Sequence, residues 1–410
     1  MSELSYLEKL LDGAEVEWKS LSELASLRRG RVMSKGYFVD NIGEYPVYSS
    51  QTANSGMIGS IDTFDFDGEF VSWTTDGANA GTVFYRKGKF SITNVCGLIK
   101  INDNSPLNYK YLFYWLSIEA KSHVYSGMGN PKLMSHQVEK IPVPIPCPSN
   151  PEKSLAIQSE IVRILDKFTA LTAELTAELT AELTARKKQY NYYRDQLLSF
   201  KEGNVAWKTL GEISRKISSG GTPKTGVTEY YDGTIPWLRT QEVDFREIWD
   251  TEIKITEEGL KTSSAKWIPK DCIIIAMYGA TVGKIGINKI PMTTNQACAN
   301  IQLDEETVHY RYVFHFLCSQ YAYIKSLGTG SQTNINAQIV KNIKIPVPFA
   351  ENPEKSLNEQ LRIVNILDKF DILTNSITEG LPREIELRQK QYEYYRDLLF
   401  SFPKPDSVTN

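Results

Sequence analysis

The feature that most constrains this chain is an internal repeat at a fixed offset. The sequence Asn-Pro-Glu-Lys-Ser-Leu occupies residues 150–155 and again residues 352–357, so the offset is 202 residues. Two longer segments recur at the same offset: 164–168 (ILDKF) as 366–370, and 187–200 (KKQYNYYRDQLLSF) as 389–402. A constant offset means that nothing has been inserted or lost between these segments, so the chain is a duplication of one plan.

The repeat alternates constant and variable stretches. The half-starts VEWKSL (16–21) and VAWKTL (205–210) match at an offset of 189, so the variable stretches differ in length by 13 residues. Residues 6–11 resemble the end of a constant segment, and such a cut repeat favours adjacent termini and a circular, pseudo-twofold arrangement. We expect these parts: an N-terminal piece of constant region (1–17), head 1 (18–150), a central constant helix (151–203), head 2 (204–352), a C-terminal constant helix (353–402) and a tail (403–410).

The constant segments are predicted to be long helices. From about residue 154 to residue 200 there is no Gly or Pro, and strong helix formers dominate. An unbroken helix of this length spans roughly 70 Å. Apolar residues four apart share one helix face, and two such stripes in one chain most simply bury each other as an antiparallel coiled coil. Gly380 and Pro382 should weaken the second helix. The two stripes are Leu171, Leu175, Leu179 and Leu183, opposite Leu373, Ile377, Leu381 and Ile385.

The expected fold class is therefore α+β, with two globular mixed α/β heads joined by two long antiparallel helices. The composition, 41% hydrophobic and 23% charged, is that of a folded protein. The sequence contains no run of about 18 apolar residues, so no membrane span is predicted, and residues 1–11 lack the apolar core of a signal peptide. Five dispersed cysteines without CxxC spacing indicate reduced thiols, so we expect a cytoplasmic protein with no membrane partner.

No catalytic motif is recognisable. Residues 279–285 (GATVGKI) are one residue short of a nucleotide-binding loop and lack the Ser or Thr after Lys284, so a turn between strands is favoured. His309 and His315 lie in an aromatic helical stretch, where core packing is the better interpretation. Each Asn-Pro pair continues with Lys or Glu, so the Asn/Asp-Pro-Pro-aromatic motif of an adenine methyltransferase is missing. We expect a non-catalytic chain without a metal site.

The heads carry polar and basic side chains suited to DNA. Asn and Gln recognise adenine, and Arg and Lys recognise guanine or hold phosphates. For any single residue a solvated loop is the simpler interpretation, and the net charge of −3 opposes a lone DNA-gripping protein unless a partner supplies phosphate contacts. The candidates are Arg28, Arg29, Arg31, Lys35, Gln51, Asn54, Thr75, Asn79, Arg86 and Lys87 in head 1, and Thr222, Lys224, Arg239, Gln241, Tyr278, Lys284, Asn295 and Gln296 in head 2.

The whole chain resembles the specificity subunits of Type I restriction–modification systems. The resemblance rests on the alternating regions, the IPVPIP…NPEKSL…ILDKF entry to each helix, and the head-2 phrases at 219–239 and 273–286. The central TAEL repeats, which begin at Thr172, resemble those of the IC subgroup.

This resemblance implies that each head recognises one half of a split, asymmetric site in double-stranded DNA. It also implies that the constant helices dock two modification subunits, which methylate adenine with S-adenosylmethionine, and that the TAEL count helps to set the spacer. Two restriction subunits using ATP and Mg are optional partners, and this chain itself binds no cofactor. Two alternatives stay open: a coiled-coil scaffold with two protein-binding heads, and a fused restriction or methyl-transfer enzyme.

Overall fold

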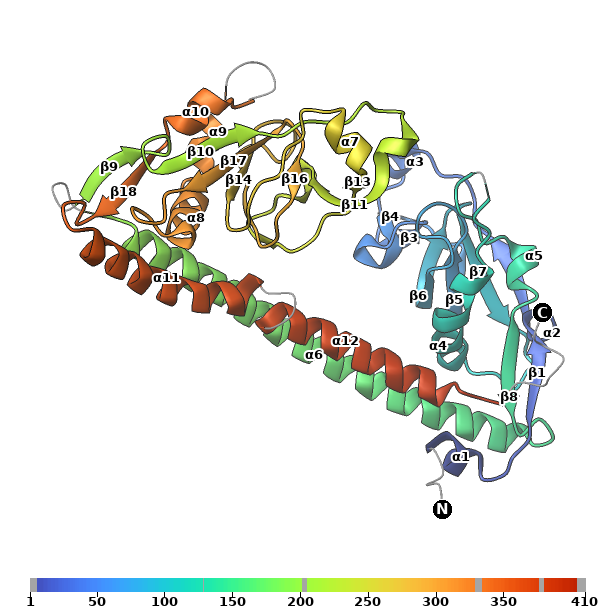
Figure 1. Ribbon diagram of the computed structural model, residues 1–410. Coiled ribbons are helices and arrows are strands. Elements are labelled where there is room, and N and C mark those ends of the chain that lie inside the picture. The colour runs from blue at the N-terminus through green and yellow to red at the C-terminus, as the bar shows by residue number, and fades with distance from the viewer. Residues whose placement is uncertain (1–5, 128, 201–204, 329–333, 376–379, 404–410) are drawn as a thin grey trace. The chain divides into compact units, whose positions relative to one another are not determined.

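The chain forms two compact α+β units. The computed structural model describes residues 6–127, 129–200, 205–328, 334–375 and 380–403. Unit 1 comprises Met1–Thr176 with Leu387–Asn410, and unit 2 comprises Ala177–Glu386 (Figure 1). Each unit therefore holds one head together with parts of both long helical segments. No helix of the described residues is long and apolar enough to cross a membrane.

Unit 1 is built around a six-stranded sheet with the order β2-β7-β5-β6-β3-β4. All neighbours are antiparallel except β3 and β6, which are parallel. A separate antiparallel pair joins β1 to β8. Helix α4 packs on β5 and β6, and its first turn is capped by Asn108. The bounds are β1 Val16–Ser20, β2 Ala25–Arg29, β3 Tyr45–Tyr48, β4 Met57–Ile61, β5 Phe66–Thr74, β6 Val83–Ile92, β7 Cys96–Ile101, β8 Pro142–Pro146, α1 Tyr6–Leu11, α2 Leu21–Leu24, α3 Lys35–Asp40, α4 Tyr109–Glu119 and α5 Ser135–Val138.

Unit 2 has a related plan, with its strands divided between two sheets and a separate pair. A five-stranded sheet has the order β10-β17-β14-β15-β12, and a three-stranded sheet has the order β13-β11-β16. The pair β9 and β18 corresponds to β1 and β8. The bounds are β9 Val205–Thr209, β10 Ser214–Ser219, β11 Tyr231–Leu238, β12 Glu247–Ile248, β13 Lys254–Ile255, β14 Ile273–Ala276, β15 Ile285–Asn288, β16 Thr293–Thr294, β17 Cys298–Leu303, β18 Lys344–Pro348, α7 Glu257–Lys261, α8 Tyr310–Ser319, α9 Tyr321–Ser326 and α10 Ala337–Lys341.

The long helical segments begin alike. Helix α6 runs from Pro151 to Leu197 as one helix of 47 residues, whereas the second copy comprises α11 (Pro353–Asn375) and α12 (Gly380–Leu399). Proline at the first helical position needs no hydrogen-bond partner for its nitrogen. The side chain of Asn150 accepts from the Lys153 amide, and Asn352 repeats this cap. The predicted weak point coincides with the start of α12, where Gly380 has φ of +81°.

The end of the chain completes the core of unit 1. Phe400 is 5% exposed, and its ring lies 5.3 Å from that of Tyr111 and 5.7 Å from that of Trp115. Leu7 of α1 belongs to the same core, so both ends of the described chain meet there. In unit 2, Leu198 at the end of α6 fills the corresponding place in the core. Each head is thus closed by the helix end of the other repeat.

The aromatic stretch of α8 is core, as its sequence predicts. His315 is fully buried, and Tyr312, Val313 and Leu317 are fully buried beside it. Tyr312 donates its hydroxyl to the Pro346 carbonyl oxygen at 2.8 Å, and Tyr111 of α4 makes the same bond to Pro144. The two heads therefore use one helix-to-strand contact to attach β18 and β8.

Candidate nucleic-acid interface

Both heads present the same hairpin loop at one end of the main sheet. In head 1 it joins β5 to β6, and the Gly81 amide donates to the Thr74 oxygen at 2.9 Å. In head 2 it joins β14 to β15, and the Gly283 amide donates to the Ala276 oxygen at 2.8 Å. The offset is again 202 residues, so residues 279–285 form the turn that the sequence favoured over a nucleotide-binding loop.

Glycine is required twice in each of these loops. Gly77 and Gly279 have φ of +88° and +83°, and Gly81 and Gly283 have φ of +80°. A side chain strains the backbone in this left-handed region. Only this Gly-Ala-Xaa-Xaa-Gly skeleton is common to the two loops, which is why sequence comparison of the variable stretches missed it.

A second loop follows β3 in head 1 and β11 in head 2. The Tyr48 oxygen accepts from the Thr93 amide at 2.9 Å, and the Leu238 oxygen accepts from the Asn295 amide at 2.9 Å. Three residues beyond those carbonyls the chain reaches Gln51 in head 1 and Gln241 in head 2. The two candidate glutamines therefore occupy equivalent positions in the two heads.

In head 2 the candidate residues gather around these loops. The Thr222 hydroxyl donates to the Gln296 side chain, and Thr281 of the hairpin donates to the Thr240 oxygen at 2.8 Å. The Tyr278 side chain is exposed at 38%. These hydrogen bonds, with that from the Asn295 amide to the Leu238 oxygen, connect the loops that carry six of the candidates, whereas Lys224 lies exposed on the loop after Thr222. The six are Thr222, Arg239, Gln241, Tyr278, Asn295 and Gln296.

The basic candidates of head 2 are held by carboxylates. Arg239 Nη2 lies 2.9 Å from Glu252 Oε2, and its Nε lies 3.7 Å from Glu242 Oε1. When the Gln241 side-chain oxygen faces the guanidinium of Arg239, it accepts from Nη2 at 2.7 Å and from Nη1 at 3.0 Å. Lys284 Nζ donates to Asp244 at 2.7 Å. These pairs orient the cations and offset their charge.

In head 1 the candidates divide into three groups. Arg31 Nε donates to Asp65 at 3.0 Å, and Lys87 Nζ lies 2.9 Å from Glu69 Oε1. Gln51 Nε2 and Arg29 Nη1 donate to backbone oxygens at 2.5 and 3.3 Å. The remaining exposed or partly exposed candidates are Arg28 on β2, Lys35 at the start of α3, Asn54 in the turn before β4, and Asn79 in the hairpin loop.

Two candidates in head 1 are buried and support the loops from inside. Arg86 is 5% exposed, donates to Ser72 at 3.0 Å and to the Ser55 oxygen at 2.8 Å, and stacks on Tyr48. Burial lowers its pKa below the ordinary value for arginine. Thr75 is fully buried. Because neither side chain reaches the surface, we leave both out of the interface proposed below.

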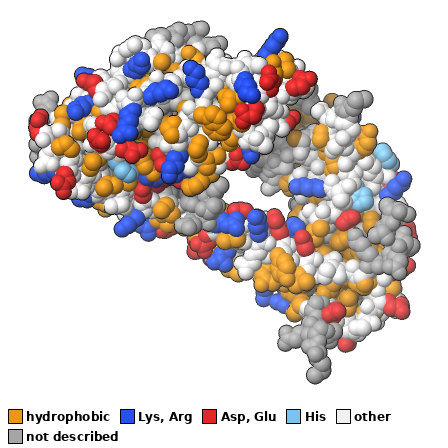
Figure 2. Space-filling view, viewed as in Figure 1, with side chains coloured by type: hydrophobic (Ala, Val, Ile, Leu, Met, Phe, Trp, Pro, Cys, Tyr) orange, Lys and Arg blue, Asp and Glu red, His pale blue; other side chains and the backbone are white. Residues whose placement is uncertain are grey.

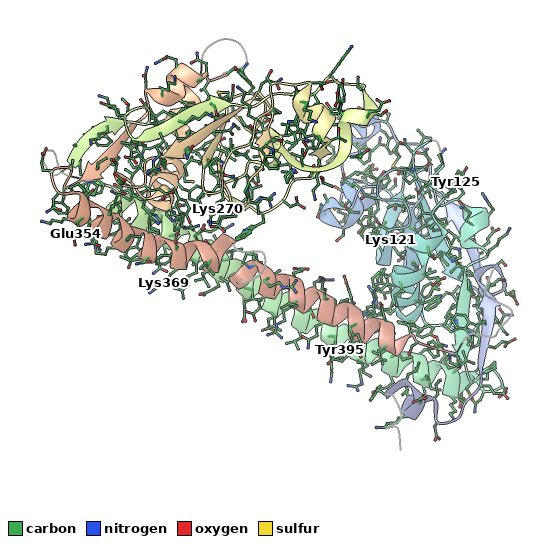
Figure 3. The ribbon with its side chains drawn as sticks, viewed as in Figure 1. Lys121, Tyr125, Lys270, Glu354, Lys369 and Tyr395 are labelled. Atoms are coloured by element: carbon green, nitrogen blue, oxygen red, sulfur yellow. The ribbon has the colours of Figure 1, made fainter. Side chains whose placement is uncertain are left out.

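The predicted spacer stripe is only partly covered. Leu171 is 51% exposed, Leu381 is 9% exposed, and Ile377 lies outside the described residues. Leu175, Leu179, Leu183, Leu373 and Ile385 are partly buried. Aromatic rings also pack between the helices. In unit 1, Phe168 stacks on Tyr395 of α12, which is labelled in Figure 3, with 5.4 Å between the ring centroids. In unit 2, Tyr193 stacks on Phe370 with 5.5 Å between the centroids. Tyr193 and Tyr395 both belong to the repeated segment QYxYYRD, which is the sequence signal for these contacts.

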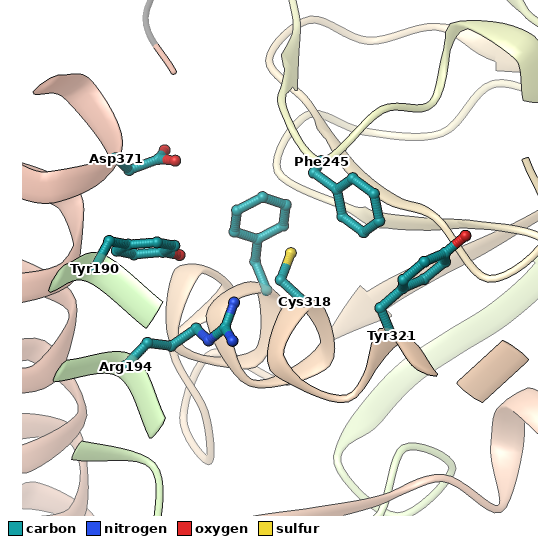
Figure 4. A pocket seen from close by; sticks show the side chains of 7 residues that line it. Tyr190, Arg194, Phe245, Cys318, Tyr321 and Asp371 are labelled. Carbon is teal, nitrogen blue, oxygen red and sulfur yellow. The ribbon is translucent and has the colours of Figure 1, made fainter. Parts of the chain in front are cut away.

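A pocket of about 200 Å³ lies in unit 2 where α6, α8 and α11 approach one another. Tyr190, Arg194, Phe245, Tyr321 and Asp371 line it with Phe314 and Cys318 (Figure 4). Burial raises the pKa of the Cys318 thiol. The wall is mostly aromatic, with one cation and one anion, so it has no set of groups arranged for proton transfer.

The face of unit 2 in view carries mixed charges, and the five thiols are free. On the face of unit 2 seen in Figure 2, Lys and Arg side chains are interspersed with Asp and Glu. All five cysteines are free, and burial raises the pKa of Cys96 to about 11 and that of Cys272 and Cys298 to about 12, so these thiols are poor nucleophiles. Among the described residues, no group of three or more His, Cys, Asp and Glu is placed to hold a metal ion.

Comparison with known proteins matches both halves of the chain to one protein family. The family model described as "Type I restriction modification DNA specificity domain" matches twice, at residues 14–185 and 203–387. The Escherichia coli Type I restriction enzyme EcoR124I/EcoR124II specificity subunit is 46% identical over 429 aligned residues, covering 100% of both chains. The Escherichia coli EcoprrI specificity subunit is 35% identical, covering 92% of this chain and 93% of that protein.

A solved structure shares the fold. It comes from a study of the complex assembly and conformational transition of the Type I restriction–modification system. Its TM-score to this chain is 0.60 at 14% identity, and the match covers 94% of this chain and 97% of the other. At this identity the likeness concerns the fold alone.

Proposed function

We propose that this chain, which belongs to the Type I restriction–modification DNA specificity subunits, recognises a bipartite, asymmetric DNA target and directs adenine methylation by partner subunits. Specificity subunits are the non-catalytic members of their complexes, and the catalytic activities lie in partner subunits. The observation that carries the proposal is the pair of equivalent loop sets, one per head, with different polar side chains at matching positions.

The difference between the loop sets implies two different half-sites. Two residues after the hairpin's first strand, head 1 has Asp76 where head 2 has Tyr278. At the loop that follows β3 and β11, Ser49 corresponds to Arg239, while Gln51 and Gln241 match. Side chains with different donors and acceptors prefer different base edges in the major groove. Two different half-sites make a target without a palindrome.

We take head 1 (18–150) and head 2 (204–352) as the two target-recognition domains. The DNA-contacting set comprises all the candidates named from the sequence except Arg86 and Thr75. The constant helices would form an antiparallel coiled coil with pseudo-twofold, circular organisation. The equivalent aromatic stacks and the filling of each core by the other repeat's helix end support this arrangement.

The partners follow from the same organisation. A duplicated constant region offers two equivalent docking sites, so we propose two modification subunits that carry S-adenosylmethionine. Two restriction subunits with ATP and Mg are optional members of the complex, which would act in the cytoplasm. The target adenine must leave the base stack to be methylated, so base flipping belongs to the modification subunit. The TAEL repeats support assignment to the IC subgroup.

A methylation map tests the proposal. The chain is co-expressed with an IC-type modification subunit in a host without its own N6-methyladenine, and the modified adenines are mapped across the genome. We expect a split, asymmetric motif with one modified adenine in each strand. A stable complex without new methylation would contradict the proposal and support a protein-binding scaffold. Replacing residues 19–125 by another head should change one half-site only.

A further inference from the structure

Each head is attached to its helix at two polar points along one helix face. In unit 1 these points are Gln158 and Asp166 of α6, and in unit 2 they are Gln360 and Asp368 of α11. Each pair is eight residues apart, a separation of about 12 Å along a helix. Between these points each helix also packs into the core of its head, through Ile161 and Leu165 in unit 1 and through Ile363 and Leu367 in unit 2. Apolar packing has little directional preference, so the two polar contacts define the angle of the head on its helix.

The first attachment is chemically the same in both units. Gln158 Oε1 accepts from the Asn108 amide at 2.8 Å, and Gln360 Oε1 accepts from the His309 amide at 2.8 Å. Both glutamines are fully buried. Each also donates, to the Pro106 oxygen in unit 1 and to the Thr307 oxygen in unit 2. This point therefore binds the N-terminus of α4 or α8 to the long helix in the same way in both units.

The second attachment uses the aspartate of the repeated ILDKF segment. Asp166 accepts from the Tyr114 hydroxyl at 2.8 Å and from Lys110 Nζ at 2.6 Å. Tyr114 also lies 3.3 Å from the Thr169 hydroxyl, which bonds Tyr392 of α12 at 3.2 Å. The contact therefore includes α4 and both long helices of unit 1.

In unit 2 the equivalent residue, Asp368, has an imidazole and a guanidinium as partners. Asp368 lies 2.7 Å from His315 Nε2 and 2.7 Å from Arg311 Nε. His315 is fully buried and its other ring nitrogen lies 3.1 Å from the Tyr190 hydroxyl of α6. The Arg311 side chain is 13% exposed and also pairs with Asp371 and Glu247. The Lys110 and Asp166 side chains are 39% and 40% exposed, so the joint of head 1 is the more solvated of the two.

We propose that Asp166 and Asp368 are positioning residues that fix the angle of each head on its own helix. They thereby restrict the number of base pairs between the two half-sites. Spacer selectivity then depends on these joints as well as on helix length. This inference rests on the proposed bipartite recognition. It applies first to Asp166, since an exposed pair contributes little to folding and its removal leaves the chain folded.

The test measures methyl transfer by the complex with the modification subunit. The substrates are duplexes with the mapped half-sites and spacers of native length or one base pair longer or shorter. For Asp166→Asn we expect the preference for the native spacer to fall by about fivefold, the scale of one partly exposed ion pair. Tyr114→Phe, which removes one hydroxyl from the same joint, should produce a smaller change in the same direction. Glu174→Gln removes the same charge from an exposed position of α6 and should leave the preference unchanged.

The outcomes separate the joint from the overall function. An Asp166→Asn complex with the wild-type spacer preference would overturn the inference. So would an equal loss of activity on all spacers, which indicates a structural role alone. Failure of the wild-type complex to recognise any split motif would refute the proposed function instead.

Discussion

Shortening the spacer helix by one TAEL unit should shorten the recognised DNA spacer. Deleting residues 176–179 joins Leu175 to Thr180 and keeps the apolar residues four apart. Helix α6 is continuous across this site, so no loop absorbs the change. At 1.5 Å per residue the deletion removes about 6 Å. That length corresponds to about two base pairs at 3.4 Å each.

Rotation limits how the DNA can follow this change. Four helical residues turn by about 400°, which is 40° beyond a full turn. At 10–10.5 base pairs per turn, one base pair turns by about 35° and two by about 70°. Length therefore favours the loss of two base pairs and rotation the loss of one. The new optimum should be one or two base pairs shorter.

The assay is the methylation map applied to the deletion variant and to Glu178→Ala, which alters the same unit without changing its length. The half-site sequences should be identical in the maps of the wild type, the deletion variant and Glu178→Ala, and only the deletion should change the spacer. An unchanged spacer in the deletion variant would refute the argument that helix length sets the distance. Altered half-sites would show that the heads do not recognise their bases independently of the helix.

Three further predictions concern stability and recognition. Phe400→Ala should destabilise unit 1 by about 3–5 kcal/mol and lower its unfolding temperature by roughly 6–20 °C in calorimetry, while exposed Ser401→Ala should not; no change would show that the chain end does not complete this core. Burial lowers the pKa of His309, so its neutral form stabilises unit 2 above the unfolded pKa of about 6.5, and that stability is lost as the pH falls below it. His309→Asn should therefore flatten the pH dependence of unfolding below about pH 6.5, and an unchanged slope would contradict the assignment. Gln241→Ala should relax one base of the second half-site by about 5–150-fold in the methylation map, leaving the first half-site intact.

The frame of the molecule was predictable because repetition and periodicity depend on many residues at once. The offset of 202 predicted two units of one plan, and residues 14–185 and 203–387 match one family model. The start of α12 at Gly380 follows from the conformational freedom of glycine and the missing amide of Pro382. The repeat and the helix start can both be recognised in the sequence itself, without knowing what packs against these residues.

The loops and joints were not predictable for a physical reason. Arg86 lies on β6 between the partly buried Tyr85 and the exposed Lys87, and only the strand's pairing with β5 decides that its side chain faces inward. Tyr114 and His315 have different chemistry at one position, yet both bond the ILDKF aspartate. A hydroxyl and an imidazole satisfy the same carboxylate, so sequence identity is low where the contact is preserved.

The near-neutral charge of the chain is compatible with DNA recognition because four of the candidate cations are already paired with carboxylates. Arg31, Lys87, Arg239 and Lys284 each lie within 3.0 Å of a carboxylate oxygen. Such pairs orient a guanidinium or ammonium toward a fixed direction while adding little net charge. A protein organised in this way gains specificity from direction and gains little of the counterion release that drives phosphate binding. Under the proposed function, phosphate contacts would then come largely from the modification subunits, and assembly of the complex would be a condition for tight DNA binding.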